Sequence, residues 1–321
     1  MGGGFWRDLG ALGRSAGLAG PVRGVRRRAA EYVAAYGGVV APIVDAAVGD
    51  PGLREHVGRS LCSAGAKAGF LIQGYTTMAG VPFRADLAVL GGAVARLYDD
   101  LLDEFGSEEL VRRLSVLFDG GPFSPRNDVE RLLCELYREV ERRLGRGRDD
   151  PIFAALTAVH EHQARSRQQS DPAIPALTLA EITEAKGGAA IVVLFALMRP
   201  SMSDREMSLI RDVGGVLQLL DDYQDVALDR QAGVVTAAVR GEVTLSDICR
   251  LFRVMRRPLS DYYGRIRPFS AVLYAILWIA FLRLHWPGLG VGGPPASTPF
   301  GVLVRPGDNL VQKAGQRRHG N

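Results

Sequence analysis

Apolar residues recur along most of this chain at the spacing of amphipathic helices, and runs that alternate apolar and polar residues are scarce. Breaks rich in Pro and Gly, such as residues 50–52, separate the helical stretches, and Ser203 with Glu206 predicts a capping box at the start of one of them. The pattern predicts helices over residues 27–48, 52–79, 84–105, 107–118, 127–146, 151–169, 179–198, 203–230, 244–265 and 269–285. No strand is predicted, so we expect an all-α, single-domain helical bundle of about ten helices.

The two ends of the chain differ from its helical middle. Residues 1–25 are rich in Gly and Arg, and we expect a flexible basic segment there. Residues 287–321 are rich in Pro, Gly and polar side chains, and we expect a disordered tail that takes no part in chemistry. The all-α domain is therefore predicted over residues 26–286.

Composition and charge argue against several classes of function. The formal net charge is +4, and basic and aromatic residues are not interleaved as in proteins that bind single strands, so no nucleic-acid partner is expected. Cys62, Cys134 and Cys249 lack the spacing of a disulfide framework or a zinc site, which favours a reducing, cytoplasmic location. No secretory signal is visible, and the most apolar run, residues 271–282, is too short to span a bilayer. We interpret that run as a buried core helix.

The acidic pattern D-D-x-x-D occurs twice, each time inside an apolar, helix-forming stretch. Residues four apart share a helix face, so the first and last carboxylates of each copy point the same way and repel one another without a cation. Two such clusters that face each other across a cavity would bind several hard divalent cations, and the cations would hold a polyanion such as a diphosphate. The predicted metal ligands are Asp99, Asp100 and Asp103 in the first copy and Asp221, Asp222 and Asp225 in the second.

Two further polar residues belong to the predicted site. Lys186 precedes Gly187 and a long apolar run, and a Lys at this position reaches a phosphate oxygen as a point charge. Gln218 lies three residues before Asp221, on the arc of the helix that we expect to face the cavity. The alternative interpretations are an ordinary surface Lys and a polar residue at the edge of a helix.

These motifs, in this order and spacing, resemble the trans-isoprenyl diphosphate synthase branch of the class I terpenoid synthase superfamily over roughly residues 55–240. The first D-D-x-x-D matches the first aspartate-rich helix of that family, Lys186 matches its mid-chain Lys, and residues 215–225 match its second motif with the preceding Gln. The resemblance implies the isoprenoid synthase fold around a central apolar cavity. It also implies three Mg²⁺ ions, a prenyl diphosphate whose head lies between the two motifs, and a homodimer.

The chain departs from the chain-elongating members of this family where those bind isopentenyl diphosphate. Their early Gly-Gly-Lys-Arg-x-Arg-Pro segment corresponds here to residues 65–71, which keep Lys67 and lack the arginines. Their Arg-Arg pair soon after the first motif is replaced by Glu108 and Glu109, and Arg112 and Arg113 follow about one turn later. A second anionic substrate has thus lost most of its expected cations. The motif N-x-x-x-S-x-x-x-E of typical bacterial terpene cyclases is absent at the second site as well.

We therefore favour a Mg²⁺-dependent terpene synthase that ionises one prenyl diphosphate, cyclises or quenches the carbocation and releases diphosphate. Small residues near the first motif leave room for a C20 substrate, geranylgeranyl diphosphate. The predicted catalytic residues are Asp99, Asp103, Asp221 and Lys186, and the predicted substrate-binding residues are Lys186, Gln218, Lys67, Arg112, Arg113, Phe70 and Tyr75. Two alternatives stay open, namely a chain-elongating trans-prenyltransferase and a non-catalytic binding subunit that resembles a prenyl synthase.

Overall fold

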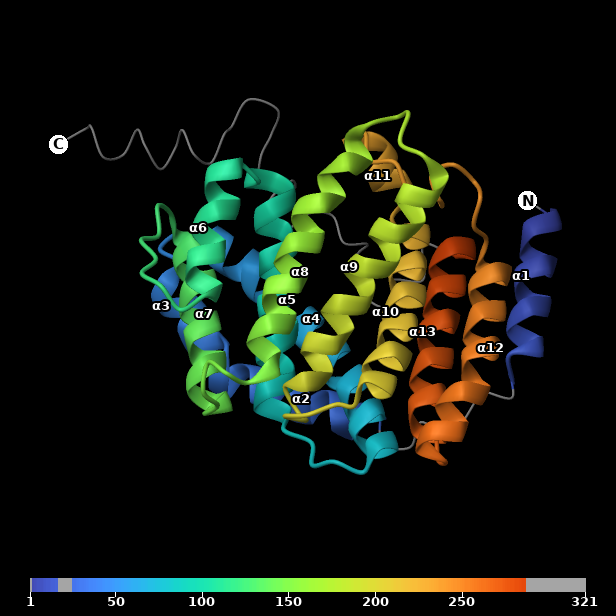
Figure 1. Cartoon of the computed structure of the whole chain (residues 1–321), viewed down its shortest axis with the longest axis horizontal. Coiled ribbons are helices and arrows are strands. Elements are labelled where there is room, and N and C mark those ends of the chain that lie inside the picture. The colour runs from blue at the N-terminus through green and yellow to red at the C-terminus, as the bar shows by residue number, and fades with distance from the viewer. Residues whose placement is uncertain (1, 17–24, 287–321) are drawn as a thin grey trace. The chain divides into compact units, whose positions relative to one another are not determined.

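The computed structural model describes residues 2–16 and 25–286. Within these ranges the regular structure is helical and no β-strand occurs, which confirms the prediction of an all-α protein (Figure 1). The helices are α1 (Gly2–Arg14), α2 (Val25–Val39), α3 (Ala41–Ala47), α4 (Pro51–Ala79), α5 (Ala85–Phe105), α6 (Glu108–Phe118), α7 (Asp128–Leu144), α8 (Pro151–Arg165), the 3-10 helix η2 (Ser166–Ser170), α9 (Ala176–Ala196), α10 (Asp204–Gln224), α11 (Val226–Ala232), α12 (Leu245–Tyr263) and α13 (Arg267–His285).

The structure has more helices in these ranges than the ten that the sequence pattern predicts. The predicted helix over residues 27–48 is divided into α2 and α3, because Pro42 lies in the first turn of α3 and fits only the start of a helix. The predicted helix over residues 203–230 is divided into α10 and α11 at Asp225. Helix α1 is additional.

Helix α1 corrects the expectation that residues 1–25 form a flexible segment. Its inward face carries Asp8, Ala11 and Leu12, which are buried, and the helix packs against α12 and α13. A Gly-rich sequence has little intrinsic helix propensity, so packing of this face stabilises the helix. The tail predicted over residues 287–321 lies outside the described residues.

The contacts between Cα atoms divide the chain into two compact units. The larger unit comprises, among the described residues, 2–16, 25–29, 68–84 and 147–286, and the smaller unit comprises 30–67 and 85–146. Helix α4 contributes its first part to the smaller unit and its last part to the larger one. The boundaries 26–286 for a single domain stay a prediction.

The larger unit is built on the packing of α9 against α10. Helix α8 packs on α9, while α12 and α13 pack on α10, and α1 covers α12 and α13 (Figure 1). In its core the ring of Tyr75 stacks on that of Phe195 with 4.0 Å between centroids, and Phe195 meets Phe269 edge to face. This packing brings the last part of α4 against α9 and α13, because the three rings come from those three helices.

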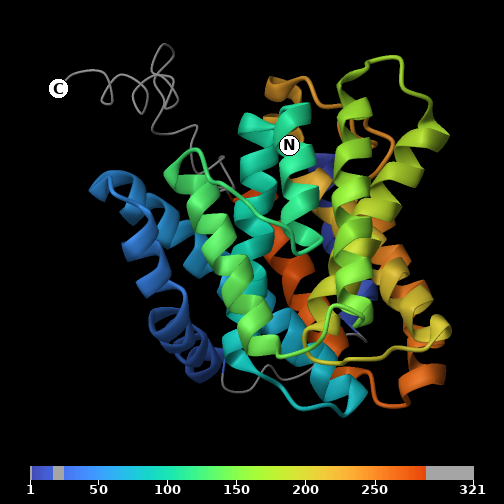
Figure 2. The same ribbon diagram turned by 60° about the vertical axis from the view of Figure 1, so that its left-hand side comes forward.

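The smaller unit is organised around α5 and α7, which lie side by side (Figure 2). The apolar run at the start of α5 is completely buried from Leu87 to Leu90, and Leu132, Leu133 and Leu136 are buried on α7. The first part of α4 comes close to α5 at Gly65, where a Cβ atom would lie 3.2 Å from Cβ of Val89. The first D-D-x-x-D therefore lies on a helix whose preceding turns are fixed by packing.

Helix α13 contains the apolar run at residues 271–282. Among the described helices it is the one long and apolar enough to cross a membrane by length and composition, with a mean hydropathy of 1.5 over an 18-residue window. Phe269, Leu273, Leu277 and Phe281 are buried at intervals of four residues and form one face directed to the interior of the larger unit. The helix is longer than the predicted run, and 39% of the window is buried, so the expectation of a core helix holds for this one face.

Candidate active site

The first acidic motif lies entirely within α5, in the smaller unit. The helix extends to Phe105, so Asp99 and Asp103 are one turn apart on the same face, as predicted. Asp99 is half-buried and Asp103 is exposed, whereas Asp100 is 2 % exposed. The motif therefore presents two carboxylates outward and turns one into the unit.

The carboxyl group of Asp100 is held inside the smaller unit by Arg96. Nη2 of Arg96, one turn earlier on α5, lies 2.8 Å from Oδ1 of Asp100, and Oδ2 is buried with no hydrogen-bond partner among the described residues. Burial raises the pKa of Asp100 to about 8, against the opposing effect of Arg96 and together with the charges of Asp99 and Asp103. An unpaired buried oxygen and a raised pKa both favour the protonated carboxyl group at this position.

The second acidic motif lies at the C-terminal end of α10, in the larger unit. The helix ends at Gln224, but the backbone N–H of Asp225 still donates to the carbonyl oxygen of Asp221, at 3.0 Å. This hydrogen bond preserves the last turn, so Asp221 and Asp225 remain neighbours. Asp221 is exposed and Asp225 half-buried, while Asp222 is 8 % exposed.

Asp222 is surrounded by polar groups from two helices. Nε2 of Gln218 donates to its Oδ1 at 2.8 Å, and Oγ1 of Thr183 on α9 lies 3.5 Å from its Oδ2. Burial raises its pKa to about 6, whereas the hydrogen bond from Gln218 and the positive charge of Lys186 act in the opposite direction. The structure thus brings together three residues that the sequence predicts for one site, namely Lys186, Gln218 and Asp222.

Glycines at the crossing of α9 and α10 produce this cluster. The backbones touch where Gly187 meets Gly214, since a Cβ atom on Gly214 would lie 2.7 Å from the carbonyl carbon of Gly187. Only glycine fits at such a separation. Because Lys186 and Thr183 lie within one turn before this contact, their side chains come next to the last two turns of α10.

The two motifs divide their carboxylates in the same way. The first and last Asp of each copy face outward, and the second Asp is buried and held by a residue four positions earlier, Arg96 or Gln218. Within residues 2–16 and 25–286, no three side chains of His, Cys, Asp or Glu converge closely enough to hold a metal ion by themselves. An outward pair fits Mg²⁺, which in phosphate sites binds one or two carboxylates and takes its remaining ligands from phosphate and water. The assignment of Asp100 and Asp222 as direct ligands stays a prediction.

The remaining predicted substrate residues have different surroundings. On α4, Lys67 is exposed and Phe70 is half-buried. Tyr75 is completely buried, and its hydroxyl group donates to Oε1 of Glu206 at 3.0 Å. Tyr75 is therefore a core residue that stacks on Phe195 and binds Glu206. The sequence predicts that it contacts the substrate, and the structure does not place it where a substrate could reach it.

The arginines after the first motif are engaged with the protein. Arg113 lies 2.6 Å from Oε2 of Glu130, donates to the carbonyl oxygen of Ser124 at 2.6 Å and stacks over the ring of Phe123. These contacts give Arg113 a structural role in place of the expected contact with a diphosphate. Arg112 is exposed, with Glu108 at 3.8 Å.

The motifs do not predict three neighbours of the site, namely Thr183, Arg283 and Asp8. Thr183 carries no motif signal, although its place one turn before Lys186 marks the same helix face. Nη1 of Arg283 on α13 donates to Oε1 of Gln224 at 3.3 Å. Burial raises the pKa of Tyr223, and the charge of Asp8 on α1 adds to that effect. The paired glycines at 187–188 and 214–215 are visible in the sequence, and pairs of this kind indicate where two helices approach closely.

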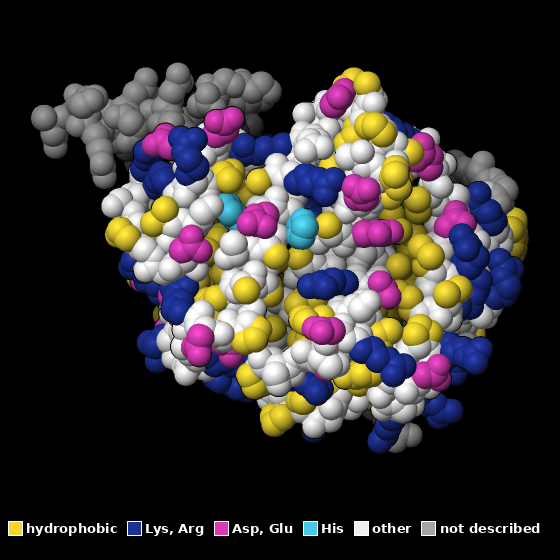
Figure 3. Space-filling model, viewed as in Figure 1, with side chains coloured by type: hydrophobic (Ala, Val, Ile, Leu, Met, Phe, Trp, Pro, Cys, Tyr) yellow, Lys and Arg dark blue, Asp and Glu magenta, His cyan; other side chains and the backbone are white. Residues whose placement is uncertain are grey.

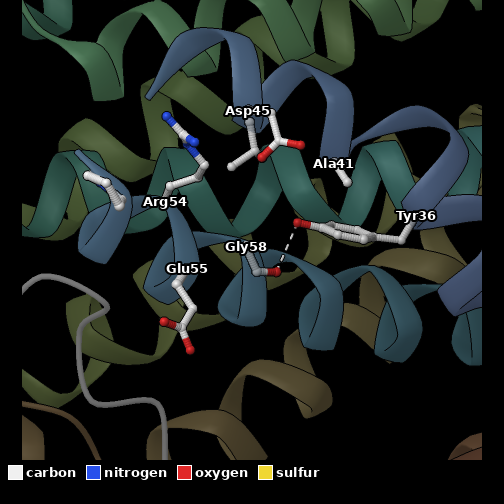
Figure 4. Close-up of a pocket in the computed structure, with 8 residues that line it drawn as sticks. Tyr36, Ala41, Asp45, Arg54, Glu55 and Gly58 are labelled. Carbon is white, nitrogen blue, oxygen red and sulfur yellow. Dashed lines mark hydrogen bonds between the residues drawn. The ribbon is translucent and has the colours of Figure 1, made fainter. Parts of the chain in front are cut away.

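A separate pocket of about 240 Å³ opens in the smaller unit, lined by Tyr36, Asp45, Arg54, Glu55 and Gly58 among others (Figure 4). The guanidinium group of Arg54 donates to the carbonyl oxygen of Val48 at 2.8 and 2.9 Å, and the Tyr36 hydroxyl donates to that of Gly58 at 2.9 Å. These polar groups are used in holding α2, α3 and α4 together. No residue of the predicted site lines this pocket.

Comparison with known proteins gives a likeness in structure and none in sequence. No family model matches the sequence, and no curated protein matches it. The structure is similar to the crystal structure of a geranyltransferase from Legionella pneumophila, with 16% sequence identity and a TM-score of 0.47, over 81% of this chain and 96% of that chain. The functional conclusion therefore comes from the residues of the two motifs and their neighbours.

Proposed function

We propose that this chain is a Mg²⁺-dependent class I terpene synthase that acts on a single prenyl diphosphate, with the C20 compound geranylgeranyl diphosphate as the preferred substrate. One observation carries the proposal. At the crossing of α9 and α10, Lys186, Thr183 and Gln218 gather around Asp222, while Asp221 and Asp225 face outward. A Lys beside an outward carboxylate pair suits the head of a metal-bound diphosphate.

The residues divide the work of the proposed reaction. Each outward pair, Asp99 with Asp103 and Asp221 with Asp225, would hold Mg²⁺, and the resemblance implies three ions in all. Bound Mg²⁺ supplies Lewis-acid stabilisation of the negative charge that develops on the leaving diphosphate. Lys186 adds a positive charge at the same oxygens, where it lowers the barrier because the charge grows in the transition state.

The buried polar groups keep the carboxylates in place. Gln218 and Thr183 fix the carboxyl group of Asp222, and through it the last turn of α10 that carries Asp221. Arg96 does the same for Asp100 on α5. Phe70, half-buried on α4, is the proposed apolar wall for the prenyl chain, where an aromatic face stabilises a carbocation.

The surroundings of the basic residues favour one substrate over two. Chain elongation needs cations for a second diphosphate, and charge-assisted pairs with Arg are the strong ones. Arg113 is taken up by Glu130 and Ser124, and Lys67 is the remaining basic residue of the early segment. This use of Arg113 supports cyclisation or quenching of one carbocation rather than condensation with isopentenyl diphosphate.

An incubation with defined substrates tests the proposal. Purified protein receives Mg²⁺ and geranylgeranyl diphosphate, with and without isopentenyl diphosphate, and hydrocarbon and diphosphate products are analysed separately. We expect a hexane-extractable terpene and stoichiometric diphosphate from the single substrate, and neither product in EDTA. A longer prenyl diphosphate that forms only with both substrates would identify a chain-elongating transferase instead. No turnover of any C10 to C25 substrate would identify a binding subunit.

A further inference from the structure

Two tryptophans form an exposed aromatic patch at one end of the larger unit. Trp6 on α1 is 69 % exposed and Trp286, directly after α13, is 45 % exposed. The ring of Phe5 joins them, with its centroid 5.1 Å from that of Trp6 and 5.4 Å from that of Trp286. We call Trp6, Phe5 and Trp286 the tryptophan patch. Indole rings normally bury most of their surface, so a joined pair in the open indicates a binding surface.

The patch rests on a packed base. The ring of Phe5 lies 5.6 Å from that of Phe281, which is buried in α13. Oδ2 of Asp8 lies 3.2 Å from Nε2 of His285, and the hydroxyl group of Tyr274 donates to the carbonyl oxygen of Leu12 at 3.1 Å. These contacts fix α1 along α13, so the two tryptophans are presented in a defined arrangement.

The outward face of α1 is basic. Arg7 and Arg14 are exposed, and the one acidic residue of the helix, Asp8, points inward and is buried. In the sequence, the first 28 residues contain six arginines and one aspartate. Figure 3 shows Lys and Arg side chains gathered over α12 and α1, with apolar side chains between them. A helix that presents Trp together with Arg is suited to the boundary between anionic headgroups and acyl chains.

The second acidic motif lies at the same end of the larger unit. Arg283, near the end of α13, donates a hydrogen bond to Gln224 of that motif. Asp8 on α1 is close enough to Tyr223 for its charge to raise the pKa of the tyrosine, after the larger effect of burial. A lipid surface that meets the tryptophan patch would therefore lie beside the last turn of α10. A prenyl chain partitions into lipid for the same reason that apolar side chains leave water.

We propose that the tryptophan patch, with Arg7 and Arg14, docks this protein on the surface of an anionic phospholipid bilayer. The indole rings enter the headgroup region, where Trp is enriched, and the guanidinium groups meet the lipid phosphates. Docking is a property of this surface and needs neither Mg²⁺ nor prenyl diphosphate. Its test is therefore independent of the proposed enzymatic activity.

Vesicle flotation of the full chain in EDTA and without substrate tests the proposal. Vesicles of phosphatidylcholine mixed with phosphatidylglycerol are compared with vesicles of phosphatidylcholine alone. We expect binding to the mixed vesicles, a roughly five- to tenfold weaker binding by Trp6→Ala, and a loss of roughly fivefold per charge in Arg7→Gln and Arg14→Gln. Leu177→Ala is the matched control, because Leu177 is 74 % exposed on α9, outside the patch, and its replacement leaves binding unchanged.

A second measurement needs no variant. Lipids brominated near the headgroup quench Trp fluorescence on contact, and the chain has three tryptophans, Trp6, Trp278 and Trp286. We expect quenching in the mixed vesicles. We expect 0.5 M salt to abolish most of it, because the screening length there is about half of that at 0.1 M. Absence of quenching, equal binding to phosphatidylcholine alone, or equal binding by Trp6→Ala would each overturn the proposal. A change of oligomeric state in Trp6→Ala without any vesicle binding would assign the patch to a second copy of the chain.

Discussion

Gly187 on α9 and Gly214 on α10 meet backbone to backbone. A Cβ atom on Gly187 would lie 3.0 Å from the carbonyl carbon of Gly214, and one on Gly214 would lie 2.7 Å from Cα of Gly188. Real Cβ atoms do not approach backbone atoms at the shorter of these distances. The contact sets the distance between α9, which carries Thr183 and Lys186, and α10, which carries Gln218 and Asp222. The geometry of the candidate site therefore depends on the absence of a side chain at both glycines.

Substitution of either glycine tests this dependence. Gly214→Ala forces α9 and α10 apart, and we expect a loss of about 1–3 kcal/mol in the free energy of unfolding, as for other overpacked interiors. Gly187→Ala has the same effect. Urea unfolding followed by circular dichroism at 222 nm measures it, with the midpoint moving to lower urea.

The control for this prediction is the neighbouring glycine. A Cβ atom on Gly215 would lie 3.4 Å from Cα of Glu184, an ordinary contact. Gly215→Ala therefore leaves the helices in place and raises stability by about 0.5–1 kcal/mol, because Ala loses less backbone entropy than Gly in a helix. Equal effects of Gly214→Ala and Gly215→Ala would show that the crossing is looser than the structure indicates.

Glu206 holds three helices of the larger unit together. Its Oε1 atom accepts hydrogen bonds from the hydroxyl groups of Tyr75 at 3.0 Å and Tyr263 at 2.8 Å, and from Nη1 of Arg199 at 3.2 Å. Glu206→Ala leaves the completely buried Tyr75 hydroxyl group without its partner, and we expect a loss of about 3 kcal/mol in the free energy of unfolding. Thermal and urea unfolding both measure this change.

Glu181→Ala provides the comparison for Glu206→Ala. Glu181 also accepts from an arginine, Arg165, at 2.9 Å, but both side chains are exposed to water. Surface pairs of this kind contribute about 1 kcal/mol or less. A loss of the same size in the two variants would contradict the assignment of Glu206 as a buried anchor.

Asp100 makes stability depend on pH. Because burial raises its pKa to about 8 in the folded protein, the folded chain keeps a proton that the unfolded chain has already released. The stabilisation is full below the pKa of the unfolded chain, near 4, and is lost as the pH rises to about 8. In EDTA, we therefore expect the free energy of unfolding to fall between pH 5 and pH 8, and to fall less in Asp100→Asn, where no proton is released. An unchanged pH dependence in the variant would assign it to other groups.

Hydrophobic spacing in the sequence was sufficient to predict the helices that carry the site. The sequence predicts a helix over residues 84–105, and α5 spans Ala85–Phe105, where the apolar run before Asp99 is buried continuously from Leu87 to Ala93. The i to i+4 relation of Asp221 and Asp225 also follows from local backbone geometry alone. Motif order also predicts that Lys186 and Gln218 lie near the second acidic motif, and the structure places both beside Asp222; their role in a site stays a prediction.

The sequence patterns do not predict how helices that are distant in the chain pack against each other. The capping interaction at Ser203 is present, with its side chain accepting from the N–H of Glu206, but the carboxylate of Glu206 turns to Tyr75 and Tyr263 instead of back to the cap. Local sequence favours the capping box, and two tyrosines from other helices compete successfully for the same oxygens. Helix α1 is a similar case, because its stabilising partners, α12 and α13, lie more than 230 residues away in sequence.

Loss of an outward carboxylate is expected to abolish turnover. Asp99→Ala and Asp221→Ala each remove one oxygen pair from an outward face, and we expect kcat to fall by at least roughly a hundredfold, because the metal stabilises charge that develops in the transition state. The helical circular dichroism spectrum stays as in the parent chain, since neither residue is in the core. Asp119→Ala, at the exposed end of α6, is the control with full activity. Activity retained in either site variant would remove that residue from the metal site.

Thr183 allows a finer test, because it touches Asp222 and no outward carboxylate. Thr183→Val keeps the shape of the side chain and removes the hydroxyl group that lies 3.5 Å from Oδ2 of Asp222. Partners behind metal-binding residues typically contribute ten- to a hundredfold to metal affinity. We therefore expect the Mg²⁺ concentration for half-maximal activity to rise about tenfold, with kcat at saturating Mg²⁺ changed much less. Thr157→Val on α8 removes a hydroxyl group that binds only the carbonyl oxygen of Phe153 in its own helix, and its Mg²⁺ dependence stays that of the parent. If both variants behave alike, Thr183 does not position the second motif.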